Sequence, residues 1–399
     1  SDFQIVNGGQ TTSAIYAAKK NSRLDISNVS VQMKLSVVND IKKKSEFVSS
    51  VSQYANTQNK VNKSDFFSNS PFHKEMKDFS KRIWVGASGG SQKRTHWFYE
   101  RVRGEYLNEQ AYLTPGKKKQ YQMENPKDQL IEKTFLAKSE NSWEQKPHIV
   151  SKGAQYSFEE FANSVTDTLE KNELAITENY FKDAISRVIL FRTTEKIVSK
   201  ASWYENAFRA QTVAYSIALL SYLIRKRKLF LDFNKIWEEQ RVPRELEDVM
   251  RSITKKVYER ITNPPPGSAN IAQWCKKEQC WKDVRLIEAD ISPIRTMVIT
   301  IEEARYEQKS GKKEKELING IEMQMFVIQS DFEIWNQLFG YYMSNNNFRS
   351  LTITQRDILK KYTDGKIPVP SEKQSKVLYS LYQKALKEGW EVQTTTYNT

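Results

Sequence analysis

The segment from Phe3 to Tyr16 constrains the fold more than any other part of the sequence. Its first apolar residues predict a buried strand, two glycines predict a turn, and a helix is expected to begin near Ser13. Glycine adopts backbone angles that other residues avoid and lets a ligand approach the main chain. Free amides at a helix start attract anions, and Thr11 or Thr12 could cap this helix. The sequence therefore predicts an anion-binding turn, or otherwise an ordinary strand-to-helix corner.

Polar side chains surround this turn. Asn7 and Gln10 supply amide donors and acceptors on either side of Gly8 and Gly9. A second polar segment, 56–59, follows the end of a predicted helix and could pack beside the turn, although a helix-capping cluster is the alternative. The predicted ligand- or phosphate-binding residues are Asn7, Gly8, Gly9, Gln10, Thr11, Thr12, Asn56, Gln58 and Asn59.

Five segments carry motifs that are specific in combination. They are Ile5–Thr12, Asn56–Val61 with Asp65–Phe66, Trp97–Gly104, Val150–Gln155, and Trp274–Lys277 with Cys280–Trp281. Together they resemble the bacterial abortive-infection phage-resistance family, known as AIPR. The resemblance implies phage defence without a settled chemistry. It also implies a substantial region upstream of the first motif, so we expect the chain to be a fragment or a processed product.

The turn at Asn7 is also similar to the Asp-Gly-Gln-His/Gln-Arg motif of bacterial DNA-modification and restriction proteins related to the ParB/sulfiredoxin-like fold. Some of those proteins bind or hydrolyse nucleotides, and a nucleotide with Mg is the candidate cofactor here. In an ungapped match, Asn7 replaces the aspartate and Thr11 replaces the arginine. Without these two groups, charge that develops on a phosphate is less stabilised. The resemblance therefore implies phosphate binding more strongly than hydrolysis.

The charge balance favours an anionic partner. The chain has 399 residues, of which 62 are Lys or Arg and 48 are Asp or Glu, giving a net charge of +14. Such a surplus suits nucleic acid, although lysine-rich helices that merely keep the protein soluble are the alternative. A nucleic-acid partner is therefore the first expectation.

Two segments supply candidate phosphate contacts. In the Trp97–Arg103 segment we assign the two leading aromatics to the core, and Arg101 and Arg103 to nucleic-acid binding. The glycine-rich loop before Lys93 and Arg94 lacks the Gly-Lys-Ser/Thr spacing of a phosphate loop. Its two cations remain candidates for contacts with a nucleic-acid backbone.

Catalytic constellations are scarce in the sequence. None of the 3 histidines has a second histidine at metal-ligand spacing, so we predict no metal site and assign no catalytic residue. Cys275 and Cys280 are interpreted as packed residues in a reducing compartment. The apolar run Val213–Ile224 is shorter than the roughly 20 residues that span a bilayer. We expect a cytoplasmic protein with no membrane partner, and leave its oligomeric state open.

The expected fold class is α+β or α/β. The sequence predicts an α/β domain of ParB/sulfiredoxin-like fold at 1–151, a helical domain at 152–262 and a C-terminal helical domain at 263–399. Alternating apolar residues between Val29 and Val37 predict a half-buried strand, and the basic segment 112–125 predicts a surface loop.

Three functions are compatible with these features. The first is an antiphage defence protein that recognises nucleic acid or a nucleotide. The second is an enzyme, either a nucleotide hydrolase or a metal-dependent nuclease. The third is an assembly module whose basic surface binds an acidic protein partner.

Overall fold

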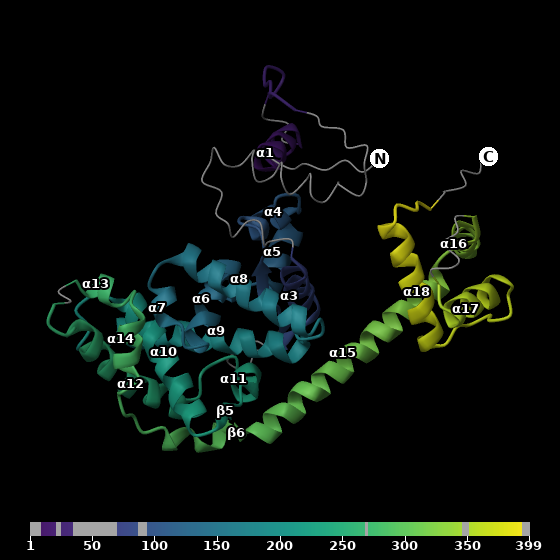
Figure 1. Ribbon diagram of the computed structural model, residues 1–399. Helices are drawn as coiled ribbons and strands as arrows, with labels where there is room; N and C mark the ends of the chain where they lie inside the picture. Colours follow the sequence, from purple (N-terminus) through teal and green to yellow (C-terminus); the bar gives the residue numbers. More distant parts are fainter. Residues whose placement is uncertain are drawn as a thin grey trace. The chain divides into compact units, whose positions relative to one another are not determined.

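The computed structural model describes residues 9–20, 25–34, 70–86, 94–267, 270–344 and 351–392. Within these residues the fold is α+β and mostly helical, with three two-stranded sheets (Figure 1). Two compact units are formed. The larger holds the described residues of Gln10–Asp25 and Asn56–Lys312, and the smaller holds those of Ser1–Gly9, Ile26–Ala55 and Lys313–Thr399.

The larger unit contains most of the helices. They are α1 (Gly9–Lys20), α3 (Pro71–Arg82), α4 (Glu105–Gln110), α5 (Pro115–Glu124), η3 (Lys127–Gln129), α6 (Lys133–Trp143), α7 (Pro147–Val150), α8 (Ala154–Lys171), α9 (Glu178–Ser199), α10 (Arg209–Lys226), α11 (Asn234–Glu239), α12 (Arg244–Thr262), α13 (Ile271–Trp274), α14 (Glu278–Val284) and η4 (Ser292–Met297). Helix α15 (Ile301–Gln329) begins in this unit and ends in the smaller one.

Three short strand pairs accompany these helices. Strand β1 (Val85–Gly86) is antiparallel to β2 (Arg94–Thr95), and β5 (Leu229–Leu231) is antiparallel to β6 (Val298–Thr300). Strand β3 (Phe98–Glu100) runs parallel to β4 (Leu130–Glu132), with Glu100 opposite Glu132. Each pair is too short to form a separate layer, and helices supply most of the core.

Helices α9 and α10 lie at the centre of the larger unit's core. The residues from Val213 to Leu220 of α10 are almost completely buried, and the helix packs on α6, α9 and α12. Helix α9 is capped by Thr177, whose hydroxyl accepts a hydrogen bond from the Tyr180 amide at 3.2 Å. A fully buried leucine such as Leu219 stabilises the fold by about 2 to 5 kcal/mol relative to alanine. The apolar run Val213–Ile224 is therefore a largely buried part of α10.

The smaller unit has its own core. Helices α16 (Phe332–Ser344), α17 (Ile353–Thr363) and α18 (Glu372–Lys387) enclose the buried Trp335 together with the end of α15. Capping boxes begin α17 at Thr352 and α18 at Ser371. Among the residues that the structure describes, this core contains none from the larger unit, so the smaller unit has an independent source of stability.

Two local predictions are wrong. Residues 25–34 contain no strand, and the alternating Val29, Val31 and Met33 are all exposed. Period-two alternation specifies a strand only where a partner strand pairs with it, and the described residues provide none here. The basic segment 112–125 is not a loop, because α5 occupies most of it with Pro115 at its first position.

The other architectural predictions have different outcomes. The class α+β is confirmed, whereas the ParB/sulfiredoxin-like fold of the N-terminal region is not confirmed. Its predicted first strand and the segment from Leu35 to Val37 lie outside the described residues. One core combines side chains from Phe72 to Met297. The division into three domains at 151 and 262 stays a prediction.

Candidate nucleic-acid interface

The predicted ligand-binding turn is described only in part. Asn7, Gly8, Asn56, Gln58, Asn59 and Lys93 lie outside the described residues. Gly9, Gln10, Thr11 and Thr12 form the first turn of α1. The helix therefore begins four residues earlier than predicted, and Thr11 and Thr12 are exposed helical residues rather than caps. The amides of Gly9, Gln10 and Thr11 have no intrahelical carbonyl to bond, so an anion site there stays a prediction.

The motif Trp97–Gly104 forms β3 and the turn that follows it. Trp97 is buried, and its indole Nε1 donates a hydrogen bond to Oε1 of Gln240 at 2.6 Å. The Phe98 ring is also buried, and its centroid lies 3.4 Å from the Lys77 ammonium nitrogen. These contacts confirm that both aromatics are core side chains.

The next aromatic, Tyr99, anchors the strand to α3. Its hydroxyl lies 2.6 Å from Nδ1 of His73, and the His73 ring is nearly parallel to those of Tyr99 and Phe158, with centroids 5.9 Å and 5.7 Å away. Burial, followed by the positive charges of Lys133 and Arg101, lowers the pKa of His73 to about 3. The imidazole is therefore neutral at neutral pH, and β3 is held by a buried uncharged pair.

The turn after β3 is fixed by two carboxylates. Glu100 accepts a hydrogen bond from the Tyr106 amide at 3.2 Å, and burial raises the pKa of its carboxyl group. Glu105 accepts from the Arg101 amide at 3.0 Å and lies 3.5 Å from the Lys77 ammonium. Gly104 has a φ of +83°, which favours glycine. The turn holds its backbone tightly.

Among the described residues, the side-chain hydrogen bonds between α4 and helix α5 involve the second half of α5 and its C-cap. Oε2 of Glu109 accepts from the Tyr121 hydroxyl at 2.8 Å, and the carbonyl of Asn125 accepts from the Tyr106 hydroxyl at 2.7 Å. None of the ten residues of α5 is buried. Its first half therefore extends into solvent, and that half contains the exposed residues Lys117–Lys119.

The lysines of α5 stand at the unfavourable end of their helix. A helix N-terminus carries partial positive charge, so cations there destabilise the helix and anions stabilise it. The first turn of α5 contains no acidic residue, and among the described residues no carboxylate pairs with Lys117, Lys118 or Lys119. Three cations in this position attract an anion and have no evident structural role.

Two of the predicted arginines flank α5. Arg94 is exposed on β2, a strand that packs against α5. Arg103 is exposed in the turn that leads into α4, the helix bonded to α5. Arg101 is half-buried beside the same turn. We refer to the exposed cations on α5, on β2 and in the turn before α4 together as the α5 surface: Arg94, Arg103 and Lys117–Lys119.

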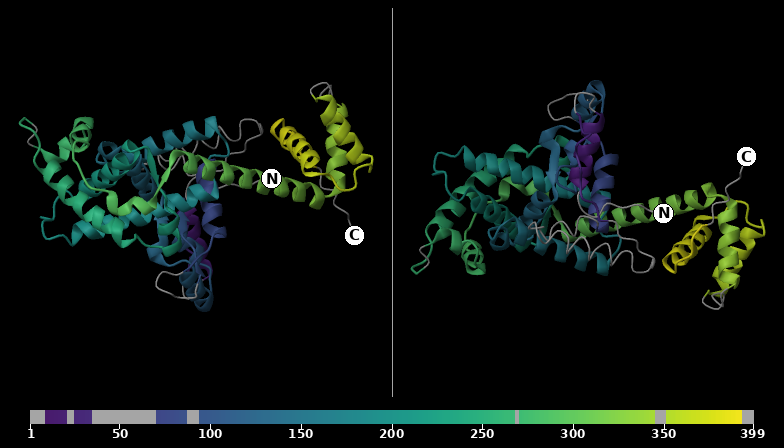
Figure 2. Two further views of the ribbon diagram at one scale, coloured as in Figure 1. Left: turned by 90° about the horizontal axis from the view of Figure 1, so that it is seen from below. Right: turned by 90° about the horizontal axis from the view of Figure 1, so that it is seen from above.

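An exposed aromatic pair adjoins this surface. The rings of Tyr16 on α1 and Tyr112 after α4 meet edge to face, with centroids 5.2 Å apart. The Lys20 ammonium lies 5.0 Å from the first ring centroid and 5.7 Å from the second. Figures 1 and 2 show α1 beside α4 and α5. Sequence reasoning missed this pair, although the spacing of Thr12, Tyr16 and Lys20 puts them on one helix face.

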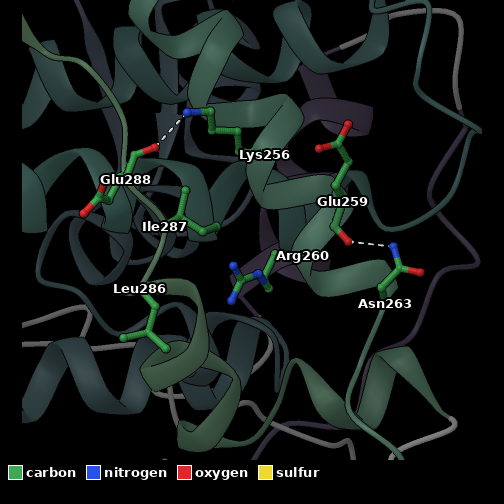
Figure 3. Close-up of a pocket in the computed structure, with 7 residues that line it drawn as sticks. All are labelled: Lys256, Glu259, Arg260, Asn263, Leu286, Ile287 and Glu288. Carbon is green, nitrogen blue, oxygen red and sulfur yellow. Dashed lines mark hydrogen bonds between the residues drawn. The ribbon is translucent and has the colours of Figure 1, made fainter.

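A surface pocket of about 380 Å³ lies elsewhere, between the end of α12 and the segment after α14 (Figure 3). Its two cations are already engaged. The Lys256 ammonium donates to the Glu288 carbonyl at 2.7 Å, and the Arg260 guanidinium lies 3.1 Å from the Asp283 carboxylate. The pocket is lined by Lys256, Glu259, Arg260, Asn263, Leu286, Ile287 and Glu288. It contains no predicted site residue.

The part of the chain that the structure describes holds no group of three or more His, Cys, Asp or Glu residues that could bind a metal ion. Cys275 and Cys280 are free and buried, in agreement with their interpretation as packed residues. Over the same residues, every helix is too short or too polar to cross a membrane.

Comparison with known proteins gives one match. The model of the AIPR protein family matches residues 1–265, which include α1, β3 and α5 and end just after α12. The motif Trp274–Lys277 with Cys280–Trp281 lies beyond that match. No curated protein and no solved structure matches the chain. The match covers well over half of the sequence, so the chain belongs to the AIPR family, which associates it with abortive-infection defence against phage.

Proposed function

We propose that this chain serves antiphage defence by binding nucleic acid through its phosphates. The proposal rests on the exposure of Lys117–Lys119 near the N-terminus of α5, where their positive charges are unfavourable to the helix dipole. The chain's net charge of +14 points to the same class of partner. Family membership supplies the defence role, and the α5 surface supplies the binding role.

The spacing of the cations favours a polyanion over a single small anion. Lys117 stands eight residues before Asn125, which bonds the start of α4 near Arg103. Eight residues of helix rise roughly 12 Å, which exceeds the size of one phosphate group. A nucleic-acid strand carries charge at about 3.4 Å intervals along its axis, so several phosphates can meet these cations together.

The test is the salt dependence of binding. Neutralising Lys117, Lys118 and Lys119 together with glutamine should weaken binding to DNA and RNA. It should also reduce the log-log salt slope by roughly 0.9 for each lost phosphate contact on duplex DNA. The slope is measured by fluorescence anisotropy between low and physiological salt.

The matched control removes the same charge from another basic helix. Lys373, Lys376 and Lys387 are exposed on α18 and can be changed to glutamine in the same way. Equal slopes in the two triple variants would refute a specific role for α5. Tight binding to an acidic protein with no binding to nucleic acid would favour the assembly-module alternative.

A further inference from the structure

The exposed pair Tyr16–Tyr112 has an unusual environment. Aromatic pairs usually stabilise proteins from inside the core, where ring faces are covered. Here Tyr16 is 47% exposed and Tyr112 is 46% exposed, although they come from segments far apart in the sequence. Ring area therefore remains available to a ligand after the two tyrosines have packed against each other.

One cation contacts the pair, and others lie close to it in the sequence. Lys20 lies over both rings, and Lys19 next to it is exposed at the end of α1. Lys117 follows Tyr112 by five residues, at the exposed start of α5. The pair is thus bordered by the same lysines that carry the proposed function.

We propose that Tyr16 and Tyr112 form a stacking site for an unpaired base, so the preferred partner is single-stranded nucleic acid. Every base has a π face that stacks on an aromatic ring, and single strands expose those faces, whereas a duplex buries them. Lys20 and the lysines of α5 contact the phosphates beside the stacked base. The inference rests on the proposed function and specifies its substrate class.

The first experiment separates stacking from charge. The variant Tyr16→Leu with Tyr112→Leu keeps an apolar contact between α1 and the segment after α4 but removes both rings. Its affinity for a thymidine 20-mer should fall by roughly 10-fold, a value within the range for base–aromatic stacking. Its affinity for a duplex of the same length should change by less than about 2-fold, with an unchanged salt slope because no charge is lost.

Two matched variants control this measurement. Tyr16→Phe with Tyr112→Phe keeps the rings and should bind the 20-mer within about 2-fold of the unmodified chain. Tyr156→Leu with Tyr306→Leu removes two tyrosines that are 60% and 75% exposed elsewhere, and should have no effect on binding. Melting temperatures establish that each variant is folded.

A second measurement uses the unmodified chain and needs no folded variant. A 20-mer with 5-iodouracil in place of thymine crosslinks on irradiation to aromatic side chains that stack on it. Mass spectrometry should locate the crosslink at Tyr16 or Tyr112. Crosslinks confined to other residues would overturn the stacking site.

The outcomes distinguish this inference from the proposed function. Equal loss of single-strand and duplex affinity in the leucine variant, or no loss in either, would overturn the stacking site while the α5 surface still accounts for binding. Absence of all nucleic-acid binding by the unmodified chain would overturn both. Loss confined to the single strand supports the inference.

Discussion

The turn after β3 and helix α5 are neighbours with opposite relations to the core. The turn is held by the buried Glu100, by Glu105 and by a left-handed Gly104. Helix α5 has no buried residue, and its hydrogen bonds to α4 among the described residues come from its second half and its C-cap. Both carry cations on their exposed sides. Basic residues that look alike in the sequence can therefore lie on backbone segments that differ greatly in how firmly they are bound to the core.

This difference predicts where substitutions will act. Changes beneath the turn should alter the free energy of unfolding, because the turn is connected to the core through Tyr99 and His73. Changes at the start of α5 should alter binding, because nothing in the core depends on those side chains. Three predictions test this contrast, in decreasing order of expected effect.

The largest effect should come from His73 as pH falls. Its folded pKa of about 3 lies below the ordinary value of 6.5, so the neutral form is favoured by folding. The resulting stabilisation is complete above pH 6.5 and is lost as pH falls toward 3. Between pH 7 and pH 4 the loss should reach at most about 3 kcal/mol. Urea denaturation at several pH values measures it.

The control for this prediction replaces His73 with glutamine, which has no titrating group. The variant is expected to be less stable at pH 7 because it loses the ring stacking. Its unfolding free energy should nevertheless fall less than that of the unmodified chain on going to pH 4. An equal fall in both proteins would assign the acid sensitivity to other groups.

One glycine in the turn and one on α5 allow the backbones of the two segments to be compared directly. Gly104 has a φ of +83°, whereas Gly116 on α5 has no left-handed backbone, and a Cβ at either position meets no atom within 4 Å. Gly104→Ala should destabilise the fold by roughly 1 to 2 kcal/mol through backbone strain alone. Gly116→Ala should be neutral or stabilise by up to about 1 kcal/mol. The melting temperatures of both variants, measured under one condition, test this prediction. Equal shifts in melting temperature would contradict the difference between the turn and α5.

The same two regions show what the sequence could predict. The core positions of Trp97 and Phe98 could be predicted because exposing clustered aromatic side chains to water is unfavourable, and the buried part of α10 could be predicted from its mostly apolar run. Helix α5 was missed because Pro115 followed by Gly116 is typical of a turn, although proline also suits the first position of a helix. Local signals do not decide between these two readings.

The tyrosine pair was beyond the reach of sequence reasoning for a different reason. Tyr16 and Tyr112 meet only because the fold brings α1 close to the segment between α4 and α5, and no periodicity in the sequence indicates that contact. The strand predicted from the alternation between Val29 and Met33 is wrong for the same kind of reason. The local pattern suits a strand, but the described residues provide no partner strand for it. Tertiary partners decide both cases.

The smallest and most specific prediction concerns Lys117. Thr114 is the N-cap of α5 and makes no side-chain capping hydrogen bond, and Lys117 stands three residues after it. Lys117→Glu would place a glutamate at the third helical position, where it can accept a hydrogen bond from the Thr114 amide, and a negative charge at the favourable end of the helix, so α5 should gain roughly 0.5 to 1 kcal/mol. Nucleic-acid binding should weaken, because a phosphate contact becomes a repulsion.

The control is Lys119→Glu, which should weaken binding similarly but stabilise α5 less. Its charge lies farther from the helix end, and it does not occupy the third helical position of a capping box. Chemical denaturation and anisotropy on the same samples measure both quantities. A variant that gains stability and keeps full affinity would show that Lys117 contacts no phosphate, and the basic start of α5 would then need another explanation.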